Sequence, residues 1–275
     1  SRPFPPLAQT RLISPPSFMP YSQSVSRWCF DSFSLEDLAE RAANLGLQGI
    51  DLLHPGEAAT VQSFGLTCPV TAAPVHESGL GCIERAFNRR EHHDTLVEIY
   101  RDLIPAAAES GIPHVITFSG NREGLSSREG IENCTAGLER ILPLAEEHDV
   151  VLIMELLNSR IDHPDYQCDH TDWGVELCKK IDHPRFKLLY DIYHMQVMEG
   201  NVIATIRDNI DYLAHFHTAG VPGRHELGPD QELNYPAIAR ALAGTGYSGF
   251  VGHEFVPTAE DPFSSLAQAV HTWAP

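Results

Sequence analysis

The sequence lacks the signatures of several common protein classes. Its six cysteines form no Cys-x-x-Cys pair, so it has neither a zinc-ribbon nor a thioredoxin-like motif. No run of about 18 apolar residues is present, so no segment resembles a transmembrane helix. Neither a G-x-S-x-G motif nor a P-loop occurs, which argues against an α/β-hydrolase and a nucleotide hydrolase. The His-Glu pairs lack the second histidine of a zinc protease, so that class is excluded as well.

Basic residues are scarce. The chain has 19 Lys and Arg against 37 Asp and Glu, which gives a formal net charge of −18. The basic residues are scattered, so an electrostatic surface for nucleic acid or anionic lipid is not expected. We therefore expect a small-molecule partner, with any anionic substrate bound by local contacts, and no nucleic-acid or membrane partner.

Length and composition indicate one large domain. The chain has 275 residues with 43% hydrophobic content, which is enough for a substantial core. We expect an irregular, Pro-rich N-terminal arm over residues 1–22 and a single domain over residues 23–275. The arm lacks the apolar stretch of a signal peptide, so we expect a soluble, cytoplasmic protein. Because the chain begins at Ser1 rather than Met, an exported origin stays open.

Short apolar runs alternate with longer stretches of helical periodicity, as parallel strands joined by crossover helices do. Eight such units can be counted, and they favour a closed (β/α)₈ barrel over an open doubly wound sheet. The predicted strands are Ser24–Trp28, Gly49–Leu53, Thr67–Ala72, His114–Phe118, Val150–Leu156, Phe186–Tyr190, Tyr212–His217 and Phe250–Phe255. The predicted helices include one capped by Ser34, one over 131–145, and further ones at Val202–Asn209 and Tyr235–Ala243.

Four polar residues end four successive predicted strands. Glu155 ends the fifth, Asp191 the sixth, His217 the seventh and Glu254 the eighth. Catalytic groups of parallel barrels gather at these strand ends, and neighbouring strands bring them together. Any one of them alone is more often a solvated or paired polar residue. Four such residues at the ends of successive strands favour a shared site instead, because buried acids are rare without partners.

Three carboxylates placed together repel one another unless a cation lies among them. Carboxylate oxygens with one imidazole suit a single divalent ion, Mn²⁺ or Mg²⁺ in the first place, with Co²⁺ or Zn²⁺ as alternatives. Near this expected site, Arg224 and His225 lie in a short loop after the seventh strand, where a guanidinium can clamp a carboxylate or hydroxyls. We consider two roles for His194: a hydrogen bond to a substrate oxygen, or orientation of a metal ligand. We expect His215, one layer deeper than His217, to be structural.

Four segments of the chain carry a resemblance to a known family. They are Met-Glu155-Leu-Leu-Asn158, Leu-Leu-Tyr-Asp191-Ile-Tyr-His194-Met-Gln, His215-Phe-His217-Thr-Ala-Gly-Val-Pro-Gly-Arg224-His225-Glu226 and Gly-His-Glu254-Phe. From about Gln23 to Val256 the chain resembles the hydroxypyruvate isomerase group of the xylose-isomerase-like barrel superfamily. That superfamily also contains the ketose 3-epimerases and endonuclease IV, and its barrels often pair, so a homo-oligomer is an open expectation.

The resemblance implies roles for these residues. Glu155, Asp191, His217 and Glu254 would be the metal ligands, with Glu155 and Glu254 also acting as an acid/base pair on opposite faces of the substrate. His194 and Arg224 would touch substrate oxygens. We also expect substrate contacts from His225, Asn158 and His76, the last from a long polar loop over residues 73–90. Some members of the group carry Gln at the third ligand position, whereas this chain has His217, as the 3-epimerases do.

The expected chemistry is proton transfer through an enediolate, in which the metal chelates a carbonyl oxygen and the adjacent hydroxyl. The first expectation is isomerisation of hydroxypyruvate to tartronate semialdehyde, with Arg224 holding the carboxylate. A ketose 3-epimerase or sugar isomerase and a lyase of 3-keto-glycosides would use the same site. A function from another class, a non-catalytic sugar-binding barrel, remains an alternative. The net charge of −18 argues against a DNA-repair enzyme.

Overall fold

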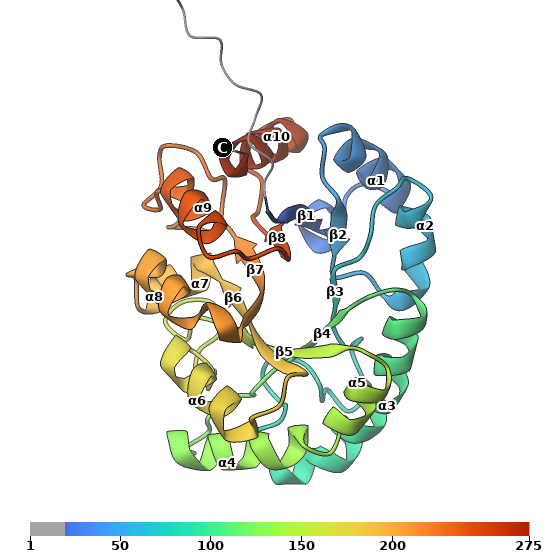
Figure 1. Cartoon of the computed structure of the whole chain (residues 1–275), viewed down its shortest axis with the longest axis vertical. Coiled ribbons are helices and arrows are strands. Elements are labelled where there is room, and N and C mark those ends of the chain that lie inside the picture. Colours follow the sequence, from blue (N-terminus) through green and yellow to red (C-terminus); the bar gives the residue numbers. More distant parts are fainter. Residues whose placement is uncertain (1–19, 275) are drawn as a thin grey trace, which may run out of the picture.

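Eight parallel strands form the centre of the structure, a computed structural model that describes residues 20–274 (Figure 1). Their order around the sheet is β2-β1-β8-β7-β6-β5-β4-β3, and directly after β2 the Leu52 N–H donates to Val70 O of β3 at 2.8 Å. The barrel is therefore nearly closed. The strands are β1 (Ser22–Ser26), β2 (Gly49–Asp51), β3 (Val70–Thr71), β4 (His114–Thr117), β5 (Val151–Leu156), β6 (Phe186–Asp191), β7 (Leu213–Thr218) and β8 (Phe250–His253).

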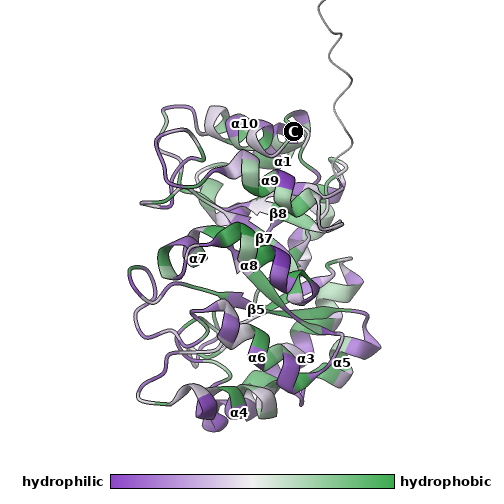
Figure 2. Ribbon diagram, turned by 60° about the vertical axis from the view of Figure 1, so that its left-hand side comes forward, coloured by the Kyte–Doolittle hydropathy of each residue, from purple (hydrophilic) through white to green (hydrophobic). Residues whose placement is uncertain are grey.

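Helices surround this barrel as an outer layer (Figure 1). They are α1 (Leu35–Asn44), α2 (Ala58–Gln62), α3 (His93–Glu109), α4 (Ser127–Leu138), α5 (Leu142–Glu147), α6 (Thr171–Ile181), α7 (Ile192–Met198), α8 (Val202–Asn209), α9 (Tyr235–Ala243) and α10 (Pro262–Trp273). The strands are largely apolar and the helices carry polar stretches, as Figure 2 shows. The apolar face of each helix packs on the sheet, which places the main core between the two layers.

The expected (β/α)₈ architecture is confirmed, and two helices have the predicted bounds, α8 and α9. The predicted cap is also present, since the Ser34 hydroxyl accepts a hydrogen bond from Asp37 N at 3.0 Å at the start of α1. Such a cap stabilises a helix by about 1 kcal/mol. Local sequence signals therefore decide these helix positions.

Several predicted bounds were wrong. The single helix expected over 131–145 is two helices, α4 and α5, because Pro143 near the start of α5 has no N–H for a continuous helix. The first strand ends at Ser26, and the 3₁₀ helix η1 (Arg27–Phe30) follows it. The third strand is only Val70–Thr71. The helix α7 was not predicted.

The predicted arm over residues 1–22 lies mostly outside the described residues, although Ser22 already belongs to β1. Within the described part of the chain, no helix combines the length and apolar character needed to cross a membrane. A G-x-G-x-x-G pattern at residues 244–249 runs from α9 into β8. That is the reverse of the strand-to-helix context in a dinucleotide-binding turn, so it does not indicate a Rossmann site.

Candidate metal centre

The four residues predicted from strand ends converge at the carboxyl-terminal mouth of the barrel. Glu155 is in β5, Asp191 ends β6, His217 is in β7 and Glu254 directly follows β8. Each offers one ligand atom, and these atoms all lie within 4.8 Å of one another. All four side chains are buried. We call this set, Glu155, Asp191, His217 and Glu254, the mouth cluster.

The imidazole of His217 lies among the carboxylates. Its Nδ1 is 3.0 Å from Glu254 Oε2 and 3.8 Å from Glu155 Oε1. Nevertheless, this nitrogen makes no hydrogen bond of good geometry with any described residue. A buried nitrogen without a partner is costly, and a metal ion would satisfy it. The donor set of three carboxylates and one imidazole also fits a divalent cation.

The charged groups of the mouth cluster shift one another's pKa values. Burial raises the pKa of Asp191, and repulsion from Glu254 adds to the rise, against the attraction of Arg224. Burial also opposes ionisation of Glu254, but His217 and Arg224 outweigh it and hold its pKa well below the usual range. In return the carboxylates hold the pKa of His217 well above its usual value, despite burial. The positive charges of His217 and Arg224 thus stabilise the ionised form of Glu254, whereas Asp191 takes up a proton more readily.

Arg224 is the cation nearest to the mouth cluster among the described residues. Its Nη2 donates to Glu254 Oε2 at 2.6 Å and lies 3.5 Å from Asp191 Oδ2. The guanidinium carbon is 5.2 Å from the ring centre of Trp28 and 5.5 Å from that of Tyr193. The Trp28 indole N–H also donates to Glu254 Oε1 at 2.7 Å. Neither aromatic residue was predicted to belong to the site.

The backbone of the loop after β7 fixes Arg224. Its φ is 61°, a left-handed value that non-glycine residues rarely adopt. Three hydrogen bonds hold this turn: Arg224 N donates to Gly220 O at 3.0 Å, Gly220 N to His225 O at 2.8 Å, and Val256 N to Arg224 O at 2.7 Å. A rare backbone conformation held this firmly is typical of functional sites.

His194 and Asn158 form a second pair beside the mouth cluster. His194 Nδ1 accepts from the Asn158 backbone N–H at 3.1 Å and contacts its amide nitrogen at 2.7 Å. The proton of the neutral ring is therefore on Nε2, which is buried and lies 3.7 Å from Asp191 Oδ2. Within residues 20–274, this nitrogen has no hydrogen-bond partner. Burial and the nearby Arg224 lower the pKa of His194 well below its usual value, so the ring is neutral. His194 thus offers an N–H donor next to the cluster, and Asn158 orients it.

The structure does not bring the two other predicted substrate contacts into this group. His76 bonds Ser78 Oγ through Nδ1 at 2.6 Å and lines a cavity with His54 and Glu98, away from the mouth cluster. His225 is exposed, and its Nδ1 contacts Val256 O at 3.0 Å. Their predicted roles depended on loop conformations, which the sequence does not define.

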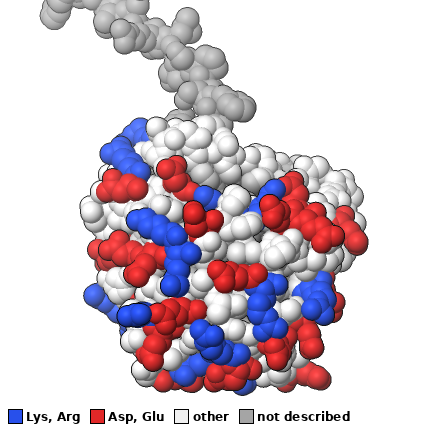
Figure 3. Space-filling view, turned by 60° about the horizontal axis from the view of Figure 1, so that its bottom comes forward, with Lys and Arg blue, Asp and Glu red and all other residues white. Residues whose placement is uncertain are grey.

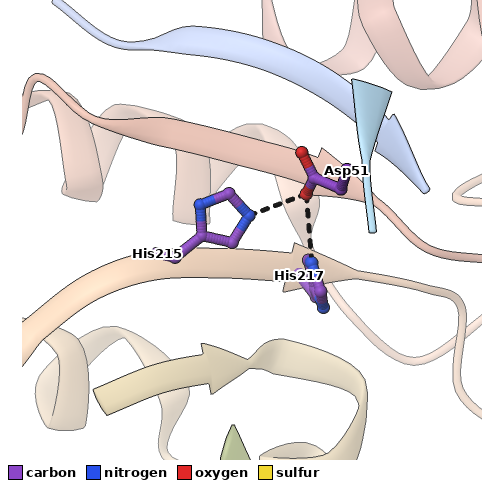
Figure 4. Close-up of side chains that lie close together, drawn as sticks. All are labelled: Asp51, His215 and His217. Carbon is purple, nitrogen blue, oxygen red and sulfur yellow. Dashed lines mark hydrogen bonds and ion pairs between the residues drawn. The ribbon is translucent and has the colours of Figure 1, made fainter. Parts of the chain in front are cut away.

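A second buried group lies deeper in the barrel, and we call Asp51, His215 and His217 the inner cluster (Figure 4). Asp51 Oδ2 contacts His215 Nε2 at 2.7 Å and His217 Nε2 at 3.1 Å. All three side chains are fully buried. Asp51 was not predicted, although it ends an apolar strand just as Asp191 does. His215 was expected one layer below His217, and its contact with Asp51 is consistent with a structural role.

Known proteins share sequence with this chain. A profile described as a xylose isomerase-like TIM barrel matches residues 39–271. A 2-oxo-tetronate isomerase of Cupriavidus necator is 37% identical over 116 residues, which are 42% of this chain and 44% of the relative. Hydroxypyruvate isomerase of Escherichia coli is 30% identical over 134 residues, 49% of this chain and 51% of the relative. These matches span about half of the relatives' length or less.

A longer match and the solved structures extend the similarity over most of the chain. A 2-oxo-tetronate isomerase of Pectobacterium atrosepticum is 26% identical over 242 residues, 80% of this chain and 86% of the relative. A crystal structure described as AP endonuclease, family 2, from Brucella melitensis has a TM-score of 0.78 at 24% identity, and covers 90% of this chain and 97% of that one. At that identity the structural match shows the fold alone. With the profile match and the barrel geometry, it follows that the chain belongs to the xylose isomerase-like TIM barrel family.

Proposed function

We propose that the protein is a metal-dependent isomerase that moves a proton through an enediolate of a small hydroxy-keto acid or sugar, with hydroxypyruvate as the first candidate. The observation that carries the proposal is the mouth cluster, in which Glu155, Asp191, His217 and Glu254 place their ligand atoms within 4.8 Å of one another. Isomerases of hydroxypyruvate and 2-oxo-tetronate among the relatives support the reaction type.

The same four residues would hold one divalent ion. Bound there, the ion would polarise a substrate carbonyl and the adjacent hydroxyl and so acidify the C–H between them. Mn²⁺ or Mg²⁺ suits the oxygen-rich donor set, with Co²⁺ or Zn²⁺ as alternatives. The proposal assigns the proton transfer to Glu155 and Glu254, on opposite faces of the substrate.

The two glutamates differ in how firmly they are held. Glu254 has hydrogen bonds from Trp28 and Arg224 and stays ionised. Glu155 approaches His217 Nδ1 only to 3.8 Å, and its side-chain oxygens have no other ion-pair partner among the described residues. A carboxylate with fewer partners can turn and exchange its proton more easily. We therefore assign the first proton abstraction to Glu155.

Two neighbours fit the charges of the substrate. Arg224 carries a guanidinium beside the site, the group best suited to clamp a carboxylate. His194 presents a neutral N–H donor, which stabilises negative charge as it develops on a substrate oxygen. The Arg224 guanidinium favours an acidic substrate over a neutral sugar, whereas the His194 donor suits either. The four-carbon acid 2-oxo-tetronate is the second candidate, because relatives with that name include the match over 80% of this chain.

Other functions of this barrel fit less well. Binding of DNA would need a basic face, whereas the net charge is −18 and acidic and basic residues intermingle on the face shown in Figure 3. A ketose 3-epimerase or a 3-keto-glycoside lyase would use the same cluster with a neutral ligand. A non-catalytic sugar-binding barrel predicts affinity without turnover. Substrate panels separate these alternatives.

The test is incorporation of solvent deuterium into hydroxypyruvate, 2-oxo-tetronate and a set of ketoses, followed by mass spectrometry. Each reaction is run with Mn²⁺ and again after chelation, and a protein-free sample corrects for spontaneous enolisation. We expect exchange that depends on the metal and is fastest with a keto acid. Exchange that survives chelation, or no exchange with any compound, would contradict the proposal.

A further inference from the structure

We propose that Asp51 is a positioning residue that holds His217 so that Nδ1 faces the metal, and that the inner cluster is a hydrogen-bonded support rather than a second metal site. The proposal rests on the proposed metal centre. Its physical basis is that metal-binding histidines depend on the partner of their other ring nitrogen, which sets the tautomer and the orientation of the ring.

The hydrogen bonds of Asp51 define this orientation. A carboxylate can only accept, so His215 Nε2 at 2.7 Å and His217 Nε2 at 3.1 Å both donate to Asp51 Oδ2. Figure 4 shows the two imidazoles approaching the same oxygen. With its proton fixed on Nε2, a neutral His217 has its lone pair on Nδ1. That is the nitrogen near Glu155 and Glu254 that lacks a partner.

The neighbouring strand β8 leaves room for this contact. Gly252 of β8 pairs with His217 of β7 in the sheet. A Cβ atom added at Gly252 would lie 2.2 Å from Asp51 Oδ2 and 2.9 Å from His217 Cδ2. Any larger residue would therefore displace the carboxylate or the ring. The absence of a side chain at position 252 lets Asp51 reach across the interior from β2.

The chemistry of the inner cluster disfavours a second ion. Its one carboxylate oxygen, Asp51 Oδ2, already accepts hydrogen bonds from both imidazoles. A metal ion at this point would have to replace both hydrogen bonds of Asp51. His217 would also need to bind ions through both ring nitrogens, and so would lose its last ring proton. A support role needs neither change.

The experiment measures Mn²⁺ binding to the full chain by isothermal titration calorimetry. Asp51→Asn keeps the shape, removes the charge and replaces one carboxylate oxygen with an NH₂ group, so we expect Mn²⁺ affinity about 10- to 100-fold weaker. Gly252→Ala, which crowds Asp51 from the other side, should weaken binding in the same direction. Gln23→Leu is the matched control: it removes another buried histidine contact, Gln23 Oε1 to His253 Nε2 at 2.8 Å, and should leave the affinity unchanged.

A double-mutant cycle separates positioning from general damage. In a His217→Gln background, Asp51→Asn should have no further effect on Mn²⁺ affinity, because Asp51 acts on the metal only by positioning His217. Equal effects of Asp51→Asn in both backgrounds, or wild-type affinity in the single variant, would overturn the proposal. A fall in stoichiometry from two ions to one would make Asp51 a metal ligand and overturn it too. If the wild type bound no Mn²⁺, the metal centre itself would be wrong, a distinct failure.

Discussion

The mouth cluster and the inner cluster share His217 and differ in charge. The mouth cluster sets three carboxylates against one imidazole, whereas the inner cluster sets one carboxylate against two. The first can be neutralised only by protons, by Arg224 or by a metal ion, and it lies at the face where barrel enzymes bind their substrates. In the second, which lies deeper in the barrel, Asp51 Oδ2 accepts hydrogen bonds from both imidazoles. Burial of an acid is therefore not by itself a sign of a metal site, whereas several carboxylates gathered around one imidazole are.

The largest expected effect comes from the mouth cluster. Glu155→Gln removes the proposed base and should lower metal-dependent deuterium exchange by at least about 100-fold. Thermal unfolding and circular dichroism serve as controls, since the fold should persist. If exchange proceeded normally in this variant, the acid/base assignment would fail.

A second prediction concerns the cation of the mouth cluster. Arg224→Ala should raise KM for an acidic substrate by about 10- to 100-fold, the range expected from losing a charge-assisted hydrogen bond. KM for a neutral ketose should change far less. Steady-state kinetics on both substrates gives the comparison, and equal changes would remove the proposed carboxylate clamp. Arg224→Lys tests whether charge alone suffices.

The smallest expected effect comes from a carboxylate outside both clusters. Glu226 accepts hydrogen bonds from Thr258 N at 2.6 Å, Thr258 Oγ1 at 2.9 Å and Ser265 Oγ at 3.0 Å. These bonds outweigh burial and lower its pKa to about 2. Ionised Glu226 therefore stabilises the folded state at pH values above the unfolded pKa of about 4.3. This stabilisation is lost as the pH falls towards 2.

Melting curves of the wild type and Glu226→Gln test this contribution. At pH 7 the variant should melt about 2–4 °C lower, a difference of order 1 kcal/mol for a chain of this size. The difference should shrink as the pH falls from about 4.5 towards 2. A difference that stayed constant over this range would show that the charge of Glu226 is not what stabilises the loop.

The sequence was sufficient to identify the mouth cluster because strands that follow one another in the chain are neighbours in a parallel barrel. Glu155, Asp191, His217 and Glu254 end successive strands, so a one-dimensional pattern predicted that they would meet. Asp51 carries the same signal at the end of β2. It was missed because that strand is only three residues long, and because its partners come from the far side of the barrel.

Features that depend on loop conformation could not be predicted. The helix α7 starts directly at Asp191, whose Oδ1 accepts from His194 N at 3.2 Å, so no linker separated strand from helix in the sequence. His76 and His225 lie in loops whose turns decide where the side chains point. The contacts of the Arg224 guanidinium with Trp28 and Tyr193 likewise depend on the left-handed backbone conformation of Arg224.

The most direct test of the proposed metal centre is the anomalous diffraction signal of crystals loaded with Mn²⁺. We expect one peak, among Glu155, Asp191, His217 Nδ1 and Glu254. A peak between Asp51 and His215, or no peak in the mouth cluster, would contradict it.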